Sequence, residues 1–164
     1  MFQDYSKRAL QIVFEARFKA GQRGSDAMDV GDLLFAFVME DQDRFRELIL
    51  QRYSEAAVYF EPESHSPFLS PDVASHLLVS LEGVLPHSVP VATSVDLPIT
   101  PDLRVVFEYA ETLRKETGRS KIEPLHLLAG ILHAGSGIVI DELQKAGITY
   151  DSVMSKLQKG TNEE

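Results

Sequence analysis

Glu123 and His126 have the residue types and spacing that metal chemistry uses. They stand three positions apart, which places a carboxylate and an imidazole on one helical face, as in carboxylate-bridged di-iron bundles. Such a centre needs a second Glu-x-x-His pair and two further glutamates, and the sequence contains no second pair. A small helical metal-binding protein or enzyme using Glu123 and His126 is one alternative. The simpler interpretation is a capping glutamate and a histidine packed at a helix start.

No arrangement in the sequence supports nucleophilic catalysis. His126 and His133 lie seven positions apart on one helical face, but no serine or cysteine with an acidic orienting partner accompanies them. Ser136 lacks the G-x-S-x-G pattern and the preceding strand of a nucleophile elbow, so we expect it to cap a helix. The chain has no cysteine, which excludes thiol nucleophiles, thiolate metal sites and disulfides. We expect no catalytic residue, no metal ion and no cofactor, and therefore a protein that is not an enzyme.

Length and charge narrow the class of protein. A chain of 164 residues is long enough to enclose one hydrophobic core without disulfides or metal. Lys and Arg total 16 against 25 Asp and Glu, and the net charge of -9 repels nucleic-acid phosphates. No stretch approaches the roughly 18 uninterrupted apolar residues of a membrane span, and the N-terminus carries no export signal. We therefore expect a soluble, cytoplasmic protein with neither nucleic acid nor membrane as partner.

Two parts of the chain are copies of one helical unit. A shift of 94 positions superimposes them without a gap, and the matched residues include helix caps, glycine breaks and apolar stripes. The pairs are Ser6 with Thr100, Ala16 with Ala110, Gly24 with Gly118, and Leu33-Leu34 with Leu127-Leu128.

Each unit predicts about four helices, because capping residues and breaks recur in the same order. The apolar faces of the second helices are the strongest, so we expect these helices to be central. First helices follow Ser6 and Thr100, second helices begin at Asp29 and Glu123, third helices follow polar turns at 40–43 and 135–137, and last helices follow Ser70 and Thr149.

The fold class predicted is all-α, with two pseudo-twofold-related repeats in one domain, 1–164. The first repeat covers about 2–83, a proline-containing linker about 84–98, and the second repeat about 99–160.

The first repeat departs from the second by an inserted loop at about 54–69. Tyr59, Phe60 and Phe68 belong to this insertion. Aromatic side chains are enriched at protein interfaces, so these three are candidate partner-binding residues. Rings in long loops also commonly anchor the loop to the core.

Three runs of residues carry a resemblance to a known family. They are Tyr-Ser-Lys-Arg-Ala at 5–9, Ile-Glu-Pro-Leu-His-Leu-Leu-Ala-Gly-Ile-Leu at 122–132, and Gly-Ser-Gly-Ile-Val at 135–139. The first is similar to an aromatic-Thr opening followed by Arg and Ala, the second to Ile-Gly-Thr-Glu-His-Leu-Leu, and the third to Gly-Glu-Gly-Val-Ala. These motifs belong to the double-repeat N-terminal domain of the Clp (Hsp100) ATPases, which the chain resembles over about 2–50 and 99–158.

The resemblance implies a domain that docks substrate polypeptides or adaptors for an unfolding motor. The expected partners are a Clp ATPase or protease component, an adaptor or a substrate polypeptide, and we expect a monomer. The chain contains no G-x-x-x-x-G-K-[ST] phosphate loop, so it acts either freestanding, as a Clp protease accessory or adaptor, or as part of a larger gene product. A third hypothesis is that the fold serves an unrelated protein partner.

The family motif also places the candidate site residues. Asp29, Asp32, Glu123 and His126 occupy the turn and the start of the second helix of each repeat, and we expect them to contact the partner. The glutamate that some family members use for phosphoarginine is replaced here by glycine at 31 and leucine at 125. Phosphoarginine binding is therefore not predicted.

Overall fold

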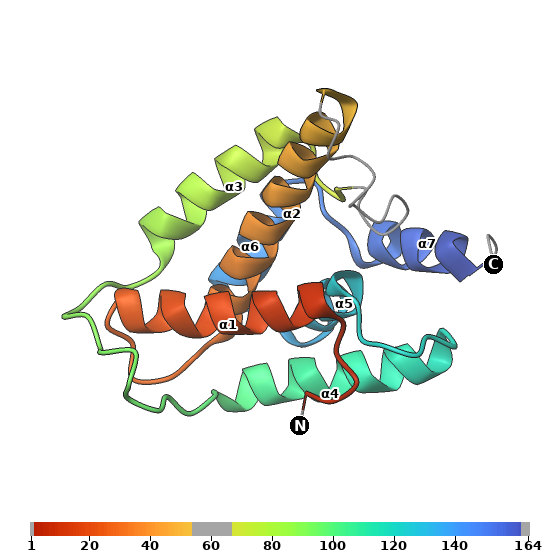
Figure 1. The fold of residues 1–164 in the computed structure, drawn as a ribbon. Coiled ribbons are helices and arrows are strands. Elements are labelled where there is room, and N and C mark those ends of the chain that lie inside the picture. Colours follow the sequence, from red (N-terminus) through yellow and green to blue (C-terminus); the bar gives the residue numbers. More distant parts are fainter. Residues whose placement is uncertain (1, 54–66, 162–164) are drawn as a thin grey trace.

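The computed structural model describes residues 2–53 and 67–161, which form seven helices (Figure 1). Tyr59 and Phe60 lie outside the described residues. The helices are α1 (Lys7–Gln22), α2 (Val30–Tyr53), α3 (Pro71–Val84), α4 (Pro101–Glu116), α5 (Pro124–Ala134), α6 (Ile138–Lys145) and α7 (Tyr150–Thr161).

Helix starts follow the predicted caps. The hydroxyl of Ser6 accepts the Ala9 N–H at 3.1 Å, and that of Thr100 accepts the Leu103 N–H at 3.2 Å. Each bond satisfies one of the N–H groups that a helix start leaves without an intrahelical partner. One cap differs from the prediction. The α6 cap is Gly137, whose φ of 59° is left-handed, and not Ser136.

One predicted break is wrong. The polar run 40–43 is not a turn but part of the continuous helix α2, so the third helix predicted to follow it is the second half of α2. Buried Glu40 accepts hydrogen bonds from Arg44, one turn later, and from Arg8 of α1 at 2.7 Å. Asp41, also buried, accepts the backbone N–H groups of Phe68 and Leu69 at 2.7 and 2.8 Å. Charged side chains can be buried between packed helices when they have hydrogen-bond partners, so the run 40–43 need not interrupt α2.

The two repeats exchange backbone hydrogen bonds in a reciprocal pattern. The Ser6 N–H donates to the Ile122 carbonyl at 3.0 Å, and the Thr100 N–H donates to the Met28 carbonyl at 3.0 Å. A shift of 94 residues converts one bond into the other. Two isolated parallel bridges, Tyr5 with Ile122 and Met28 with Ile99, obey the same relation. The chain is thus all-α with two pseudo-twofold-related repeats, as predicted.

The second helices are central, as their apolar faces predicted. Of the predicted apolar faces, all residues except the half-buried Leu132 are almost completely removed from water, and each of these contributes about 1.5–3 kcal/mol by burial. They are Leu33, Leu34, Phe37 and Val38 in α2, and Leu127, Leu128 and Ile131 in α5.

The segment 85–98 connects the repeats without forming a helix, and its first half is fastened to the end of α1. The Ser88 N–H donates to the Arg23 carbonyl at 2.7 Å, and the Val91 N–H donates to the Gly21 carbonyl at 2.8 Å. The connection is therefore held against the first repeat.

Within the described ranges, no single helix is long and apolar enough to cross a membrane. In this part of the chain, α5 and α6 meet that test of length and composition only when taken together, and they are bent by 117°.

Candidate functional site

The turn between α1 and α2 is built on a buried ion pair. Arg23 donates through Nε and Nη2 to the two carboxylate oxygens of Asp32, at 2.6 and 2.9 Å. Asp32 is completely buried, and its side-chain hydrogen bonds raise the pKa of the Arg23 guanidinium above its ordinary value. Asp32 also accepts the Asp29 N–H at 2.9 Å. The pair therefore fixes the start of α2 and lies out of reach of a docked partner.

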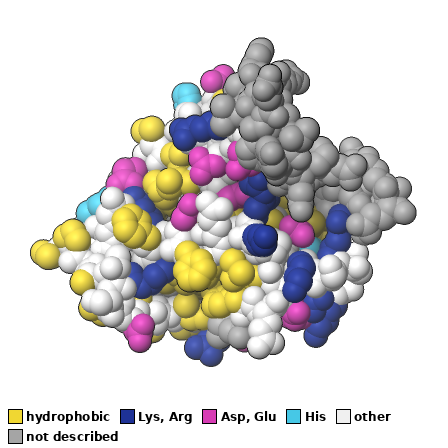
Figure 2. All heavy atoms as spheres, viewed as in Figure 1, with side chains coloured by type: hydrophobic (Ala, Val, Ile, Leu, Met, Phe, Trp, Pro, Cys, Tyr) yellow, Lys and Arg dark blue, Asp and Glu magenta, His cyan; other side chains and the backbone are white. Residues whose placement is uncertain are grey.

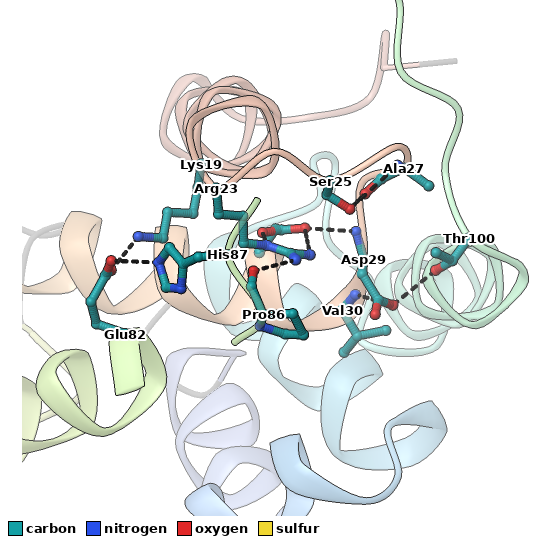
Figure 3. A network of polar contacts seen from close by, with 11 residues as sticks. Lys19, Arg23, Ser25, Ala27, Asp29, Val30, Glu82, Pro86, His87 and Thr100 are labelled. Atoms are coloured by element: carbon teal, nitrogen blue, oxygen red, sulfur yellow. Dashed lines mark hydrogen bonds and ion pairs between the residues drawn. The ribbon is translucent and has the colours of Figure 1, made fainter. Parts of the chain in front are cut away.

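The polar contacts of this turn extend to the second repeat through Asp29 (Figure 3). The Asp29 carboxylate accepts the Val30 N–H at 2.8 Å and the Thr100 hydroxyl at 3.0 Å. Thr100 caps α4, so Asp29 joins the start of α2 to the start of α4. Arg23 also donates to the Pro86 carbonyl at 3.2 Å, which ties the turn to the segment after α3. Asp29 is exposed, unlike Asp32.

The second repeat builds the same turn from neutral groups. A shift of 94 residues takes Arg23 to Thr117 and Asp32 to His126, and the Thr117 hydroxyl lies 3.0 Å from His126 Nε2. His126 Nδ1 accepts the Glu123 N–H at 2.8 Å, just as Asp32 accepts from Asp29. Nε2 therefore carries the imidazole proton and donates to Thr117. His126 is completely buried and both of its nitrogens are occupied, whereas Glu123 is half-buried.

Burial lowers the pKa of His126 from 6.5 to about 4, with smaller contributions from Arg119 and Arg114. The unfolded chain takes up this proton first, so stability is complete above pH 6.5 and is lost as pH falls towards 4. From pH 7 to pH 5 we expect His126 to lower the free energy of unfolding by about 2 kcal/mol. Urea unfolding across this range measures the effect.

The control for this pH dependence is His126→Gln, which cannot titrate. The variant is less stable at pH 7, but its free energy of unfolding should fall less steeply between pH 7 and pH 5 than that of the original chain. Parallel curves for the two proteins would contradict a neutral, buried His126.

A pocket of about 430 Å³ opens where the N-terminal segment of the first repeat meets α4 of the second. We call it the seam pocket. It combines apolar residues with charged ones, and edge-to-face contacts of Phe2, Tyr5 and Phe107 stiffen its wall, with ring centroids 5.0 to 6.4 Å apart. Its lining is Asp4, Tyr5, Ile99, Arg104, Phe107, Glu108, Glu111 and Ile122.

An apolar strip lies on the outer face of α1. Phe14 and Phe18, one turn apart, are 71% and 57% exposed, and Figure 2 shows hydrophobic side chains gathered over this helix. In the second repeat the equivalent positions are Glu108 and Thr112. Glu108 lines the seam pocket, so the two repeats present different chemistry at the same place in the unit.

Comparison with known proteins decides the fold family. Residues 98–164 match the family described as the Clp repeat (R) N-terminal domain. The chain has the Clp N-terminal domain fold. No curated protein sequence matches it.

Three solved structures resemble the whole chain. One comes from structural work on a malarial protein secretion system: TM-score 0.70, 13% identity, 98% of this chain and 96% of that one. The N-terminal domain of the chaperone ClpD from Arabidopsis thaliana matches with a TM-score of 0.64 and 16% identity, over 96% of this chain and 97% of that one. The Hsp104 N-terminal domain from Candida albicans matches with a TM-score of 0.60 and 17% identity, over 94% of this chain and 89% of that one. At sequence identities this low, the structural matches establish the fold alone. They confirm the resemblance inferred from the sequence.

Packing around position 31 accounts for the absence of the motif glutamate from the first repeat. At position 31 a Cβ would lie 2.5 Å from Cδ2 of Leu85, a residue that is itself buried. The segment after α3 thus fills the space that a larger side chain at Gly31 would need. At position 125 the half-buried leucine packs against the core. Neither repeat offers a carboxylate at the motif position.

Among the predicted aromatic residues, only Phe68 lies in the described part of the chain. It is half-buried, its N–H is held by Asp41, and Lys156 Nζ lies 5.5 Å from its ring centroid. Its contacts are those of a ring that anchors a segment to the core. Sequence reasoning missed the seam pocket and the α1 strip. The difference between Phe14 and Glu108, which are equivalent positions in the two repeats, could have indicated that the repeats differ at this surface.

Proposed function

We propose that this chain is a non-catalytic protein-interaction domain that docks polypeptides, either substrates or adaptors of a Clp protease system. The observation that carries the proposal is the seam pocket, whose apolar interior and charged edge are typical of surfaces that recognise another protein. The exposed Phe14 and Phe18 support it, because adjacent large apolar side chains on a surface mark interaction sites.

The proposal includes a cytoplasmic monomer with protein partners only, and it covers both a freestanding accessory subunit and a domain of a larger protein. Asp29 and Glu123 remain the candidate contact residues of the two turns, since part of each side chain reaches the surface. The metal-binding alternative has little support, because both imidazole nitrogens of His126 already have hydrogen-bond partners.

Ile99→Ser tests the proposal. Ile99 lines the seam pocket and is half-buried, so the change removes apolar contact area without opening the core. The probe is a fluorescently labelled, reduced and carboxymethylated protein that stays unfolded, and anisotropy measures its affinity. We expect Ile99→Ser to weaken binding at least about fivefold, which corresponds to roughly 1 kcal/mol.

The matched control is Val89→Ser, which removes an apolar side chain that is 81% exposed in the connecting segment. This variant should bind like the original chain. A pull-down from native lysate with the same three proteins tests for Clp components as partners. If the original chain bound neither the unfolded probe nor any Clp component, the proposed function would be wrong.

A further inference from the structure

A second pocket, of about 290 Å³, lies between α3 and α6 and shares no residue with the seam pocket. We call it the α3–α6 pocket. Val73, Leu77 and Ala146 give it an apolar floor, with Asp72 on the α3 side and Glu142 on the α6 side. Its volume lies just below the range for ligand sites, about 300–1,000 Å³, which suits one side chain better than a large ligand.

Glu142 is the unusual group in this pocket. Its side chain is only 6% exposed, although a carboxylate removed from water is costly unless it is well paired. The cation beside it is Lys145, with Nζ at 3.5 Å, which is longer than the usual hydrogen bond of about 2.7–3.2 Å. Lys145 is itself 73% exposed, so its ammonium group can turn to solvent without breaking other packing.

The two carboxylates of the pocket, on Asp72 and Glu142, outnumber its one ammonium group, on Lys145, and this favours a cationic occupant. Asp72 supplies a second carboxylate from the first turn of α3, and His76 and Lys145 are the basic groups. The chain as a whole carries a net charge of -9, which attracts a basic partner.

We propose that the α3–α6 pocket binds a basic side chain of a docked polypeptide. The methylene groups of that side chain would cover Val73 and Leu77, and its charged end would replace Lys145 beside Glu142 and approach Asp72. Arginine and lysine both carry such an apolar stem beneath a charged head. The inference rests on the proposed function in assuming that the ligand is a polypeptide, and it adds the chemistry of one contact.

The test is an NMR titration of the ¹⁵N-labelled chain with a blocked pentapeptide that has arginine between pairs of alanines. Its twin carries citrulline, which has nearly the same shape without the charge. We expect saturable shifts of the backbone amides of 72–77 and 142–146 with the arginine peptide only. Asp72→Asn should weaken binding by about threefold to fivefold, the loss of one partly exposed ion pair.

Lys145→Met gives the sharper result, because removal of the competing ammonium should tighten binding by about twofold or more. The control is Lys115→Met: Lys115 is 69% exposed and lies 3.8 Å from Glu111, so it is a similar lysine at another place. It should leave the affinity unchanged. Equal shifts with citrulline, no saturable shift in these two segments, or no effect of Lys145→Met would overturn the inference.

The outcome is separable from that of the proposed function. Ile99→Ser should not affect binding of the arginine peptide. Binding of the peptide without any affinity for unfolded protein or Clp components would overturn the proposed function alone.

Discussion

Asp32→Ala is expected to lower the free energy of unfolding by about 3–5 kcal/mol, because it leaves the Arg23 guanidinium buried without its carboxylate. Both partners are almost inaccessible to water, and Asp32 accepts three hydrogen bonds, two from Arg23 and one from the Asp29 N–H. Urea unfolding at pH 7, followed by circular dichroism, measures the loss. A change below about 1 kcal/mol, the value of an exposed pair, would contradict this account of the turn.

The second repeat provides a matched rescue. Arg23→Thr combined with Asp32→His introduces the Thr117 and His126 pair of the other turn, which keeps an acceptor for the N–H at position 29 and leaves no buried charge. The double variant should therefore be clearly more stable than Asp32→Ala, although it has lost more side-chain atoms. Measured against the single variants Arg23→Thr and Asp32→His, the double variant should be non-additive, as expected for residues in contact.

Gly24→Ala is expected to cost about 3 kcal/mol from two sources. The residue has φ +75°, a left-handed conformation that a Cβ disfavours, and the added Cβ would lie 2.4 Å from the Val89 carbonyl oxygen. The connecting segment would have to move, and the hydrogen bond from the Ser88 N–H to the Arg23 carbonyl would weaken. Thermal and urea unfolding measure the cost, and hydrogen exchange at the Ser88 amide should become faster.

Gly118→Ala is the control, because Gly118 occupies the equivalent place in the second repeat. Its φ is +69°, but nothing lies within 4 Å of an added Cβ. Only the backbone term applies there, about 1–2 kcal/mol. Equal losses of unfolding free energy for the two variants would show that the connecting segment does not pack closely against Gly24.

Much of the fold was predictable because it depends on local signals. Ser6 and Thr100 cap helices, and most apolar residues of 33–38 and 127–132 are buried where their spacing requires. The continuous α2 was not predictable, because the run 40–43 reads as a turn until its distant partners are known. Arg8 and the backbone of 68–69 supply those partners, and no local pattern announces them.

The candidate site was predicted less well than the fold. The sequence located the two turns correctly, but it did not show that Asp32 and His126 face inwards while Asp29 reaches the surface. Pockets depend on how helices far apart in sequence approach each other, so Ile99 and Glu142 carried no signal of their own. Comparing the two repeats position by position recovers part of this information, as the exchange of Phe14 for Glu108 shows.

The reciprocal bonds between 5–6 and 122, and between 28 and 99–100, mean that neither repeat completes its own turn. Two identical copies of a single repeat would satisfy the same bonds about a true twofold axis, and every change would then be made twice. Joining the copies in one chain removes that constraint. One half can hold its turn with a charged pair and the other with a neutral one, while the surfaces of the two halves specialise separately.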